Sequence, residues 1–300
     1  MKIISVVGAR PNFMKIAPFI KAIDEYNKLI SHTSSLIAHR LVHTGQHYDD
    51  RMSKAFFEDL GIPEADINLG VGSGTHAEQV GHTMIEFEKV LKAEKPDWVV
   101  VVGDVNATLA CSVTAKKEWI KVCHIEAGLR SGDIKMPEEV NRLVTDRLSD
   151  LLLTPDYISN ENLAKEGTDP NRVKFVGNIM IDTLETNREK ASKLVIKDIV
   201  MGNLVSDYKL ISDIPIDEQF GVITLHRPSN VDLREVLEPI IRFLLDEVTK
   251  DLTLMWPIHP RTKKQLQSFG LYDEIASHPR MILLEPLGYF DMLRDRKSVV

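Results

Sequence analysis

The chain has 300 residues, of which 43% are hydrophobic and 27% charged, a composition that excludes disordered and fibrous classes of protein. Its 37 basic and 44 acidic residues give a formal net charge of −7, which argues against nucleic acid and anionic membrane surfaces as partners. Two cysteines are too few for a disulfide framework, and no long apolar run could cross a membrane, so we expect a reduced, cytoplasmic environment.

Short runs of valine, isoleucine and leucine alternate with longer segments whose apolar residues have helical spacing. This alternation is typical of β-α units and predicts an α/β fold with parallel sheets covered on both faces. A capping box at Thr75 and Glu78 and a proline at position 137 predict two helix starts, and residues 16–23 form a further helical stripe. Strands are expected at residues 3–7, 36–43, 98–102, 122–125, 151–154 and 173–176.

The pattern changes after Gly177, where residues 182–217 are weakly patterned before strand signals return at 221–225, 252–257 and 281–284, with a helix at 236–248. We therefore predict two domains, residues 1–178 and 179–300. Residues 297–300 resemble a strand entering a sheet, with no turn or helix after it. We expect the second domain to be incomplete and the chain to be truncated, although a genuine terminal strand is the alternative.

Candidate site residues follow the first predicted strands, because open parallel sheets bind ligands beyond the carboxyl ends of their strands. Arg10 and Lys15 lie at a helix start after residues 3–7 and favour an anion, although a plain turn with surface basic residues is an equal alternative. Asp104 follows residues 98–102, where a carboxylate suits general acid or base catalysis. Its alternative role is to cap the helix ahead of Ala107.

Two further carboxylates are expected on the same face as Asp104. Glu126 ends the next strand, and Glu139 lies on the helix that begins at residue 137. Three converging carboxylates repel one another unless protons or a cation serve them, which favours a functional role. A divalent metal cluster competes with this interpretation, but the nearby Arg130 and Arg142 and the absence of metal-ligand spacing weigh against it, so no metal site is assigned. Arg142 is instead expected to bind substrate.

Imidazole and guanidinium groups follow two successive strands of the second domain. The pairs are His226 with Arg227 and His259 with Arg261. Such pairs suit an anionic leaving group such as a phosphate, and two of them facing Arg10 across a cleft favour an anion site over isolated surface residues. Gln46 and His47 are a weaker candidate for a second binding site, since a turn is the default interpretation of that segment.

Seven motifs along the chain, taken together, carry a resemblance to a known family. They are GARPxxMK from Gly8, TGQH from Thr44, GD from Gly103, HIEAGLR from His124, MPEExNR from Met136, GN from Gly177 and LHR from Leu225. In this order they resemble the non-hydrolysing UDP-N-acetylglucosamine 2-epimerases.

The resemblance implies a GT-B-like protein with two Rossmann-like, doubly wound domains and a nucleotide sugar in the cleft between them. The implied reaction inverts C2 of UDP-N-acetylglucosamine to give UDP-N-acetylmannosamine, by elimination and re-addition of UDP, for surface polysaccharide precursors. No metal or nicotinamide cofactor is implied, and a homodimer is expected.

The positions that match the family's functional residues are Arg10, Lys15, Asp104, Glu126, Glu139 and His226. Which of the three carboxylates removes the C2 proton on each face stays open. The family's Ser-Gly-Gly segment for the diphosphate is not reached before residue 300. Residues 72–76 lack the basic residues that serve an activating second substrate in some bacterial members, so allosteric activation is not implied.

Three other functions remain open at this point. A hydrolysing epimerase would release UDP and free N-acetylmannosamine after the same elimination. A GT-B glycosyltransferase needs fewer acids than the three found here. A nucleotide-sugar-binding fragment without activity is the third.

Overall fold

The computed structural model describes residues 1–30, 36–45, 64–206 and 220–296. Contacts divide the chain into two compact units, Met1–Thr186 and Asn187–Val300. This division falls inside helix α7 (Ile179–Ser192), whereas the predicted domain boundary lies at the start of that helix. The boundary at residue 178 stays a prediction.

The first unit contains a parallel sheet in the order β3-β2-β1-β4-β5-β6-β7 among its described residues. The chain winds outward from β1 to β3, then returns to β4 on the other side of β1, as in doubly wound folds. The strands are β1 (Lys2–Val7), β2 (Ala38–His43), β3 (Ile67–Asn68), β4 (Trp98–Val102), β5 (Lys121–Ile125), β6 (Leu151–Thr154) and β7 (Val173–Phe175). All six predicted strands are therefore confirmed, and only the two-residue β3 was not predicted from the sequence.

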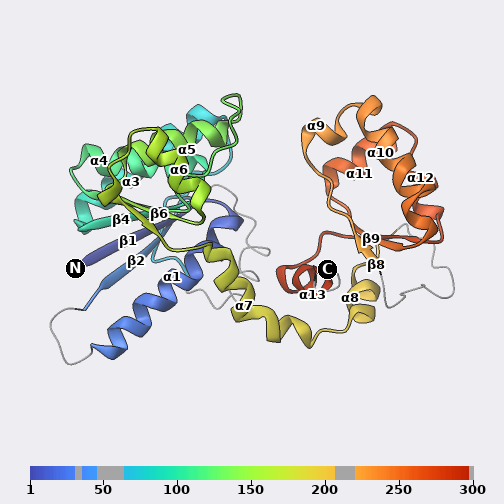
Figure 1. The fold of residues 1–300 in the computed structure, drawn as a ribbon, viewed down its shortest axis with the longest axis horizontal. Coiled ribbons are helices and arrows are strands. Elements are labelled where there is room, and N and C mark those ends of the chain that lie inside the picture. Colours follow the sequence, from blue (N-terminus) through green and yellow to red (C-terminus); the bar gives the residue numbers. More distant parts are fainter. Residues whose placement is uncertain (31–35, 46–63, 207–219, 297–300) are drawn as a thin grey trace. The chain divides into compact units, whose positions relative to one another are not determined.

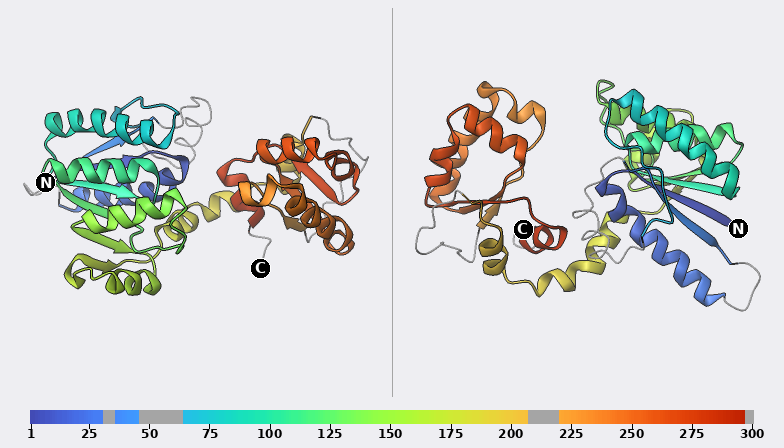
Figure 2. Two further views of the ribbon diagram at one scale, coloured as in Figure 1. Left: turned by 90° about the horizontal axis from the view of Figure 1, so that it is seen from above. Right: turned by 180° about the vertical axis from the view of Figure 1, so that it is seen from behind.

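Helices cover both faces of this sheet, as Figures 1 and 2 show: α1 lies on one face, and α3, α4 and α5 lie on the other. Phe13 and Ile16 of α1 pack on the first face, and Phe87 and Cys111 pack on the second. Strands buried between two such layers need apolar side chains throughout, which explains the runs of valine. The helices are α1 (Arg10–Leu29), α3 (His76–Glu94), α4 (Asn106–Lys117), α5 (Pro137–Leu148) and α6 (Tyr157–Lys165), with a 3-10 turn at Pro170–Arg172.

The predicted helix start at Thr75 is confirmed. The Glu78 N–H donates to Thr75 Oγ1 at 3.3 Å, and the Thr75 N–H donates to Glu78 Oε2 at 2.8 Å. This reciprocal pair satisfies two amides that the helix cannot satisfy internally.

The second unit has a smaller parallel sheet in the order β10-β9-β8, formed by Met281–Leu284, Thr253–Pro257 and Phe220–Val222. In Figure 1, α9 to α12 lie on one face of this sheet, and α8 and α13 lie on the other. Trp256 packs with Ile241 in the first of these cores, and Met255 packs with Val200 in the second. The helices are α8 (Ile196–Asn203), α9 (Pro228–Val231), α10 (Arg234–Asp246), α11 (Pro260–Ser268), α12 (Tyr272–Ser277) and α13 (Tyr289–Arg296), with a 3-10 turn at Val248–Lys250.

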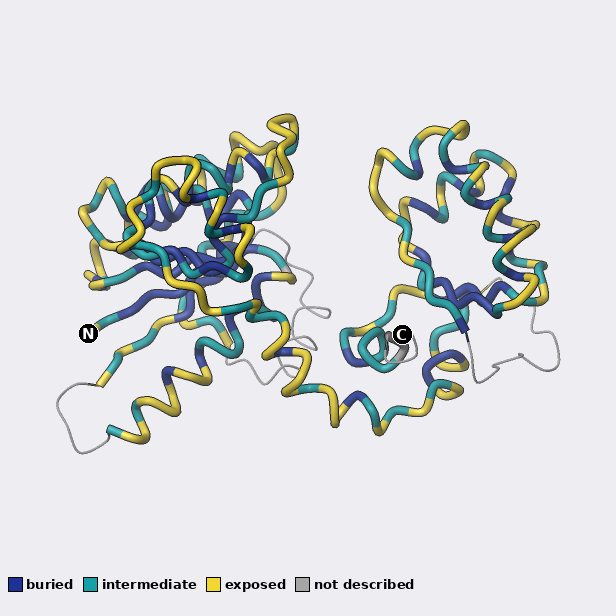
Figure 3. The backbone as a smooth tube through the Cα atoms, viewed as in Figure 1, coloured by how far each residue is buried: buried dark blue, intermediate teal, exposed yellow. Residues whose placement is uncertain are grey.

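Burial follows this layered arrangement, and Figure 3 shows the strands at the centre of each unit as buried. The parallel α/β fold predicted from the sequence is thus confirmed in both units. The strand predicted at 297–300 lies outside the described residues. Within the described part of the chain, every helix is too short or too polar to span a bilayer.

A testable consequence of the packing concerns Gly128, a buried residue after β5 with φ +84. A Cβ added there would lie 2.6 Å from the Ser159 carbonyl oxygen, whereas Gly167, at φ +74, has nothing within 4 Å of its Cβ position. Both Gly→Ala variants share the penalty of a left-handed conformation, but only Gly128→Ala also forces a clash with backbone. We expect Gly128→Ala to lower the free energy of unfolding by about 1–3 kcal/mol more than Gly167→Ala in denaturant titrations. Equal losses would show that the Ser159 contact relaxes freely.

Candidate active site

Lys15, Asp104 and Glu126 lie after the carboxyl ends of β1, β4 and β5, which are neighbours in the sheet, and Glu139 and Arg142 lie on α5. The chain reverses its winding direction between β1 and β4, and ligands bind open α/β sheets at such a switch point. Asn12, which sequence reasoning did not select, joins the first two strand ends. Its side chain accepts from the N–H groups of Gly8 and Ala9 and donates to the Val102 carbonyl at 2.9 Å.

Gly103 provides the close approach that the site requires. Its φ is +70, and an added Cβ would lie 3.1 Å from Lys15 Nζ, 3.2 Å from Asn12 Nδ2 and 3.5 Å from Glu126 Oε2. A larger residue would therefore displace the side chains that gather between β1, β4 and β5. The glycine is needed both for its backbone conformation and for this space.

Asp104, directly after Gly103, forms an ion pair with Arg142 of α5. Both contacts go to Asp104 Oδ2, from Arg142 Nη2 at 2.5 Å and from Nε at 3.0 Å. The Asn141 side chain also donates to the Asp104 carbonyl at 2.8 Å. The capping role considered for Asp104 is wrong, because α4 begins after Val105 with no side-chain cap.

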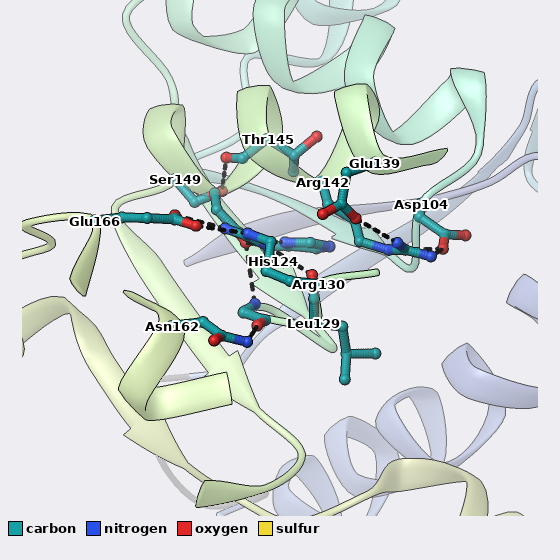
Figure 4. A network of polar contacts seen from close by, with 12 residues as sticks. Asp104, His124, Leu129, Arg130, Glu139, Arg142, Thr145, Ser149, Asn162 and Glu166 are labelled. Atoms are coloured by element: carbon teal, nitrogen blue, oxygen red, sulfur yellow. Dashed lines mark hydrogen bonds and ion pairs between the residues drawn. The ribbon is translucent and has the colours of Figure 1, made fainter. Parts of the chain in front are cut away.

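Glu139 is a buried carboxylate that shares Arg142 with Asp104 (Figure 4). Its Oε2 accepts from Arg142 Nη1 at 2.7 Å and from the Ser131 N–H at 2.9 Å, and its Oε1 accepts from the Gly132 N–H at 3.0 Å. Burial raises the pKa of this carboxyl, but the hydrogen bonds from Ser131, Arg142 and Gly132 outweigh burial and lower the pKa to about 2. Glu139 is therefore ionised at neutral pH, and both of its oxygens are engaged.

Glu126 directly follows β5 and pairs with Lys15 of α1 through Oε2. Its backbone is strained, since φ is +75 in a residue that carries a side chain. The N–H groups of Glu126 and Ala127 both donate to the Leu153 carbonyl at 3.0 Å, which holds this turn. Strained backbone conformations cluster at active sites, so this conformation supports a functional role for Glu126.

The three carboxylates differ in what they leave available to a ligand. Asp104 Oδ1 and Glu126 Oε1 have no hydrogen-bond partner among the residues that the structure describes, whereas both Glu139 oxygens are occupied. The described part of the chain contains no group of three or more His, Cys, Asp or Glu side chains arranged to hold a metal ion. The cations that serve these carboxylates are the chain's own Lys15 and Arg142.

A second polar network, missed by sequence reasoning, lies beside this cluster (Figure 4). The His124 ring contacts Asp146 Oδ1 at 2.6 Å and the Gly103 carbonyl at 2.8 Å. Asp146 Oδ2 lies 2.7 Å from Arg130 Nη1, and Arg130 forms two further bonds of 2.7 Å to Glu166. His124 is the first residue of the HIEAGLR motif, but the motif gives no sign of its partner 22 residues later.

The second unit places its predicted residues at the ends of β8 and β9. His226, Arg227 and His259 are exposed, and the two imidazole rings lie with their centroids 5.8 Å apart. Arg261 is also exposed but is paired with Asp232 by bonds of 2.8 and 2.5 Å, so it must exchange this partner to bind another anion. His259 Nδ1 accepts from the Arg261 N–H at 3.2 Å and caps α11.

For three of the predicted site residues, the structure does not describe the side chain. Gln46 and His47 lie outside the described residues, and the structure describes Arg10 only as the first residue of α1. Their roles stay predictions.

Comparison with known proteins shows which family the chain resembles. The family model described as UDP-N-acetylglucosamine 2-epimerase matches residues 30–299. The chain is 40% identical over 299 residues to the UDP-N-acetylglucosamine 2-epimerase of Methanocaldococcus jannaschii, covering 99% of this chain and 76% of that protein. It is also 37% identical over 297 residues to the UDP-2,3-diacetamido-2,3-dideoxy-D-glucuronate 2-epimerase of Pseudomonas aeruginosa, covering 98% and 75%.

Solved structures agree with the sequence matches. The M. jannaschii UDP-GlcNAc 2-epimerase in complex with UDP-GlcNAc and UDP has a TM-score of 0.82 at 39% identity, over 99% of this chain and 77% of that one. The Neisseria meningitidis UDP-GlcNAc 2-epimerase bound to UDP-GlcNAc has a TM-score of 0.81 at 27% identity, over 99% and 76%. The predicted GT-B-like class and the predicted family are confirmed. The chain belongs to the UDP-N-acetylglucosamine 2-epimerase family.

Proposed function

We propose that this protein interconverts UDP-N-acetylglucosamine and UDP-N-acetylmannosamine without net hydrolysis, by elimination of UDP and its re-addition. The homodimer and the role in surface polysaccharide precursors stay predictions from the resemblance, and the cytoplasmic location stays a prediction from the cysteine content. Family membership supports the nucleotide-sugar substrate and the epimerisation. The reaction route is supported by the arrangement of acids in the first unit.

One observation carries this proposal: Asp104 and Glu126 each have one oxygen held by a cation and the other without a partner among the described residues. A carboxylate in this state is oriented and still able to take or return a proton. Glu139 differs, because its low pKa and its occupied oxygens make it a poor base. We therefore assign proton transfer to Asp104 and Glu126, and assign to Glu139 the positioning of Arg142.

The proposed steps balance as follows. One carboxylate takes the proton from C2 while the C1–O bond breaks, and the electrons of that bond leave with UDP, so that a double bond forms between C1 and C2. The negative charges near the sugar stabilise the cationic character that develops at C1. UDP then adds back to C1, and the other carboxyl group, protonated from solvent, returns a proton to C2 from the opposite face. The first carboxyl group releases the proton taken from C2 to solvent, which restores both groups.

The second unit supplies the groups proposed to receive the diphosphate. His226, Arg227 and His259 are exposed hydrogen-bond donors at successive strand ends. A guanidinium matches two phosphate oxygens at once, and an imidazole beside it can share the charge that accumulates as UDP leaves. Arg261 is assigned to the same anion after exchange from Asp232.

A second candidate substrate arises from the Pseudomonas aeruginosa relative, whose name specifies a 2,3-diacetamido glucuronate in place of N-acetylglucosamine. That sugar also undergoes inversion at C2, so the same pair of acids would serve it. The two sugars differ at C3 and C6, away from the reacting bond. We favour UDP-N-acetylglucosamine, which the family description and the M. jannaschii relative name.

The assignment of the two acids is tested by conservative substitution. We expect Asp104→Asn and Glu126→Gln each to lower turnover of UDP-N-acetylglucosamine by at least ~100-fold, since a positioned acid or base contributes about that much. Glu138→Gln is the matched control, because it removes a carboxylate from the same helix turn as Glu139, and it should leave turnover within a few-fold. Circular dichroism checks that all three variants fold. Unchanged turnover in both Asp104→Asn and Glu126→Gln would refute the assignment.

Solvent isotope incorporation tests the elimination. In heavy water the proton returned to C2 comes from a carboxyl group in exchange with solvent, so the UDP-N-acetylmannosamine formed should carry deuterium at C2, as measured by NMR. Product without deuterium would require a direct transfer or an oxidative route. Accumulation of free N-acetylmannosamine with UDP would instead identify a hydrolysing epimerase.

The substrate assignment is tested by assaying both nucleotide sugars in parallel at equal concentration. We expect UDP-N-acetylglucosamine to be epimerised with a kcat/KM at least ~10-fold higher than that of UDP-2,3-diacetamido-2,3-dideoxy-D-glucuronate, because an enzyme discriminates between such sugars by the contacts that its site makes to the groups at C3 and C6. The reverse preference would transfer the proposal to the second sugar.

A further inference from the structure

His124 is a fully buried polar residue in a strand whose neighbours are apolar. Its exposed fraction is 0%, and its partners across the sheet are Val101 of β4 and Leu152 of β6. Both ring nitrogens nevertheless have hydrogen-bond partners, Asp146 Oδ1 and the Gly103 carbonyl. The ring is thus a polar connection through the middle of a hydrophobic layer.

The partners fix the protonation state of the ring. A carbonyl oxygen only accepts, so Nε2 must donate to Gly103. Burial raises the pKa of Asp146, but the charges and hydrogen bonds of His124 and Arg130 outweigh burial and lower it. Asp146 Oδ2 is paired with Arg130 and accepts from the Gly128 N–H, so the carboxylate acts as an acceptor independently of His124, and Nδ1 must donate to Oδ1. With both nitrogens donating, the geometry requires the cationic form of the His124 ring.

Acidic and basic side chains alternate in a series that starts at the His124 ring. Asp146 faces the ring from α5, Arg130 faces Asp146 from the segment after β5, and Glu166 faces Arg130 from the end of α6. Val101 and Leu152 bring no charge from the adjacent strands. Buried ion pairs of this kind contribute little net stability compared with apolar residues of similar size, so stability alone does not account for the pair.

The role of the His124–Asp146 pair is indicated by the segments that it connects. The Gly103 carbonyl, fixed by the ring, immediately precedes Asp104. Asp146 accepts from the Gly128 N–H at 3.0 Å, two residues after Glu126, and lies one helical turn after Arg142 on α5. The His124–Asp146 pair therefore connects the segments that carry both proton-transferring acids and the guanidinium that orients one of them.

We propose that His124, as a cation paired with Asp146, is a positioning residue that fixes the Gly103–Asp104 turn relative to Glu126 and Arg142. This inference rests on the proposed function, in which Asp104 and Glu126 transfer protons to and from C2. His124 does not touch the sugar, since the ring is buried and both nitrogens are engaged. Its effect is on the geometry of the reacting acids and not on binding of the nucleotide.

Kinetics separate this role from a merely structural one. His124→Phe keeps an aromatic ring but removes both donors, and we expect kcat to fall by about 10-fold to 100-fold, the scale for misplacement of a catalytic group, while KM stays within ~3-fold. His124→Gln keeps an N–H that can donate to the Gly103 carbonyl but loses the charged donor to Asp146, so it should recover part of the kcat that His124→Phe loses. Phe87→Leu, which changes a buried core residue of α3, is the control for lost stability and should retain kcat. Equal losses of kcat in the Phe and Gln variants, or a kcat within 3-fold of wild type in His124→Phe, would overturn the proposal.

A second measurement needs neither activity nor a folded His124→Phe variant. In wild-type protein with 15N-labelled histidine, NMR should detect protons on both ring nitrogens of His124 at neutral pH, and His124→Gln should leave the amide resonances of Gly103 and Asp104 near their wild-type positions. A single ring proton would refute the cation and with it the proposal. Failure of the proposed function would be seen differently, as wild-type protein that turns over neither nucleotide sugar while the ring still carries two protons.

Discussion

Repulsion among carboxylates is the constraint around which the first unit is organised. Parallel strands bring their carboxyl ends to one edge of the sheet, and here two adjacent strand ends and one helix present acids to the same region. Two like charges about 4 Å apart repel by about 4 kcal/mol at an effective dielectric constant near 20, which is a large part of the stability of a domain. Among the described residues, this repulsion is offset by Lys15, which pairs with Glu126, and by Arg142, which pairs with both Asp104 and Glu139.

Local sequence around two prolines places these cations. Both α1 and α5 begin with proline in the first turn, where its fixed φ suits a helix start and its missing N–H is not needed. Lys15 and Arg142 then follow about one turn into their helices, close to the strand ends. Glu139 and Arg142 are three residues apart, so they share a face of α5, and the ion pair within the helix directs the guanidinium toward Asp104.

Much of this arrangement could be predicted from the sequence, because it depends on local patterns. Apolar runs located β1, β4, β5 and β6, the Thr75 capping box located the start of α3, and the rule for open sheets directed attention to Asp104 and Glu126. Pairing between distant segments could not be predicted. Nothing in the order of residues says that Arg142 contacts Asp104 and not another acid, since that depends on how α5 is oriented over the sheet.

Two further features were beyond sequence reasoning for physical reasons. The two-residue β3 has too few residues to show a period of two, and it exists because Val42 and His43 of β2 offer it a ladder. The ion pair of His124 and Asp146 joins a strand to a helix, and a histidine inside an apolar strand is equally compatible with a simple core residue. Only the packed structure distinguishes these possibilities, by showing an acceptor at each ring nitrogen.

The left-handed backbone of Glu126 has a consequence for how this protein responds to selection. A residue with a side chain is less stable than glycine in that conformation by about 1–2 kcal/mol, so the native residue at the end of β5 opposes folding. Glycine there would relieve the strain and delete the carboxylate at the same time. Libraries enriched only for resistance to heat should therefore collect inactive variants at this position, and an assay of turnover has to accompany any screen for thermostability.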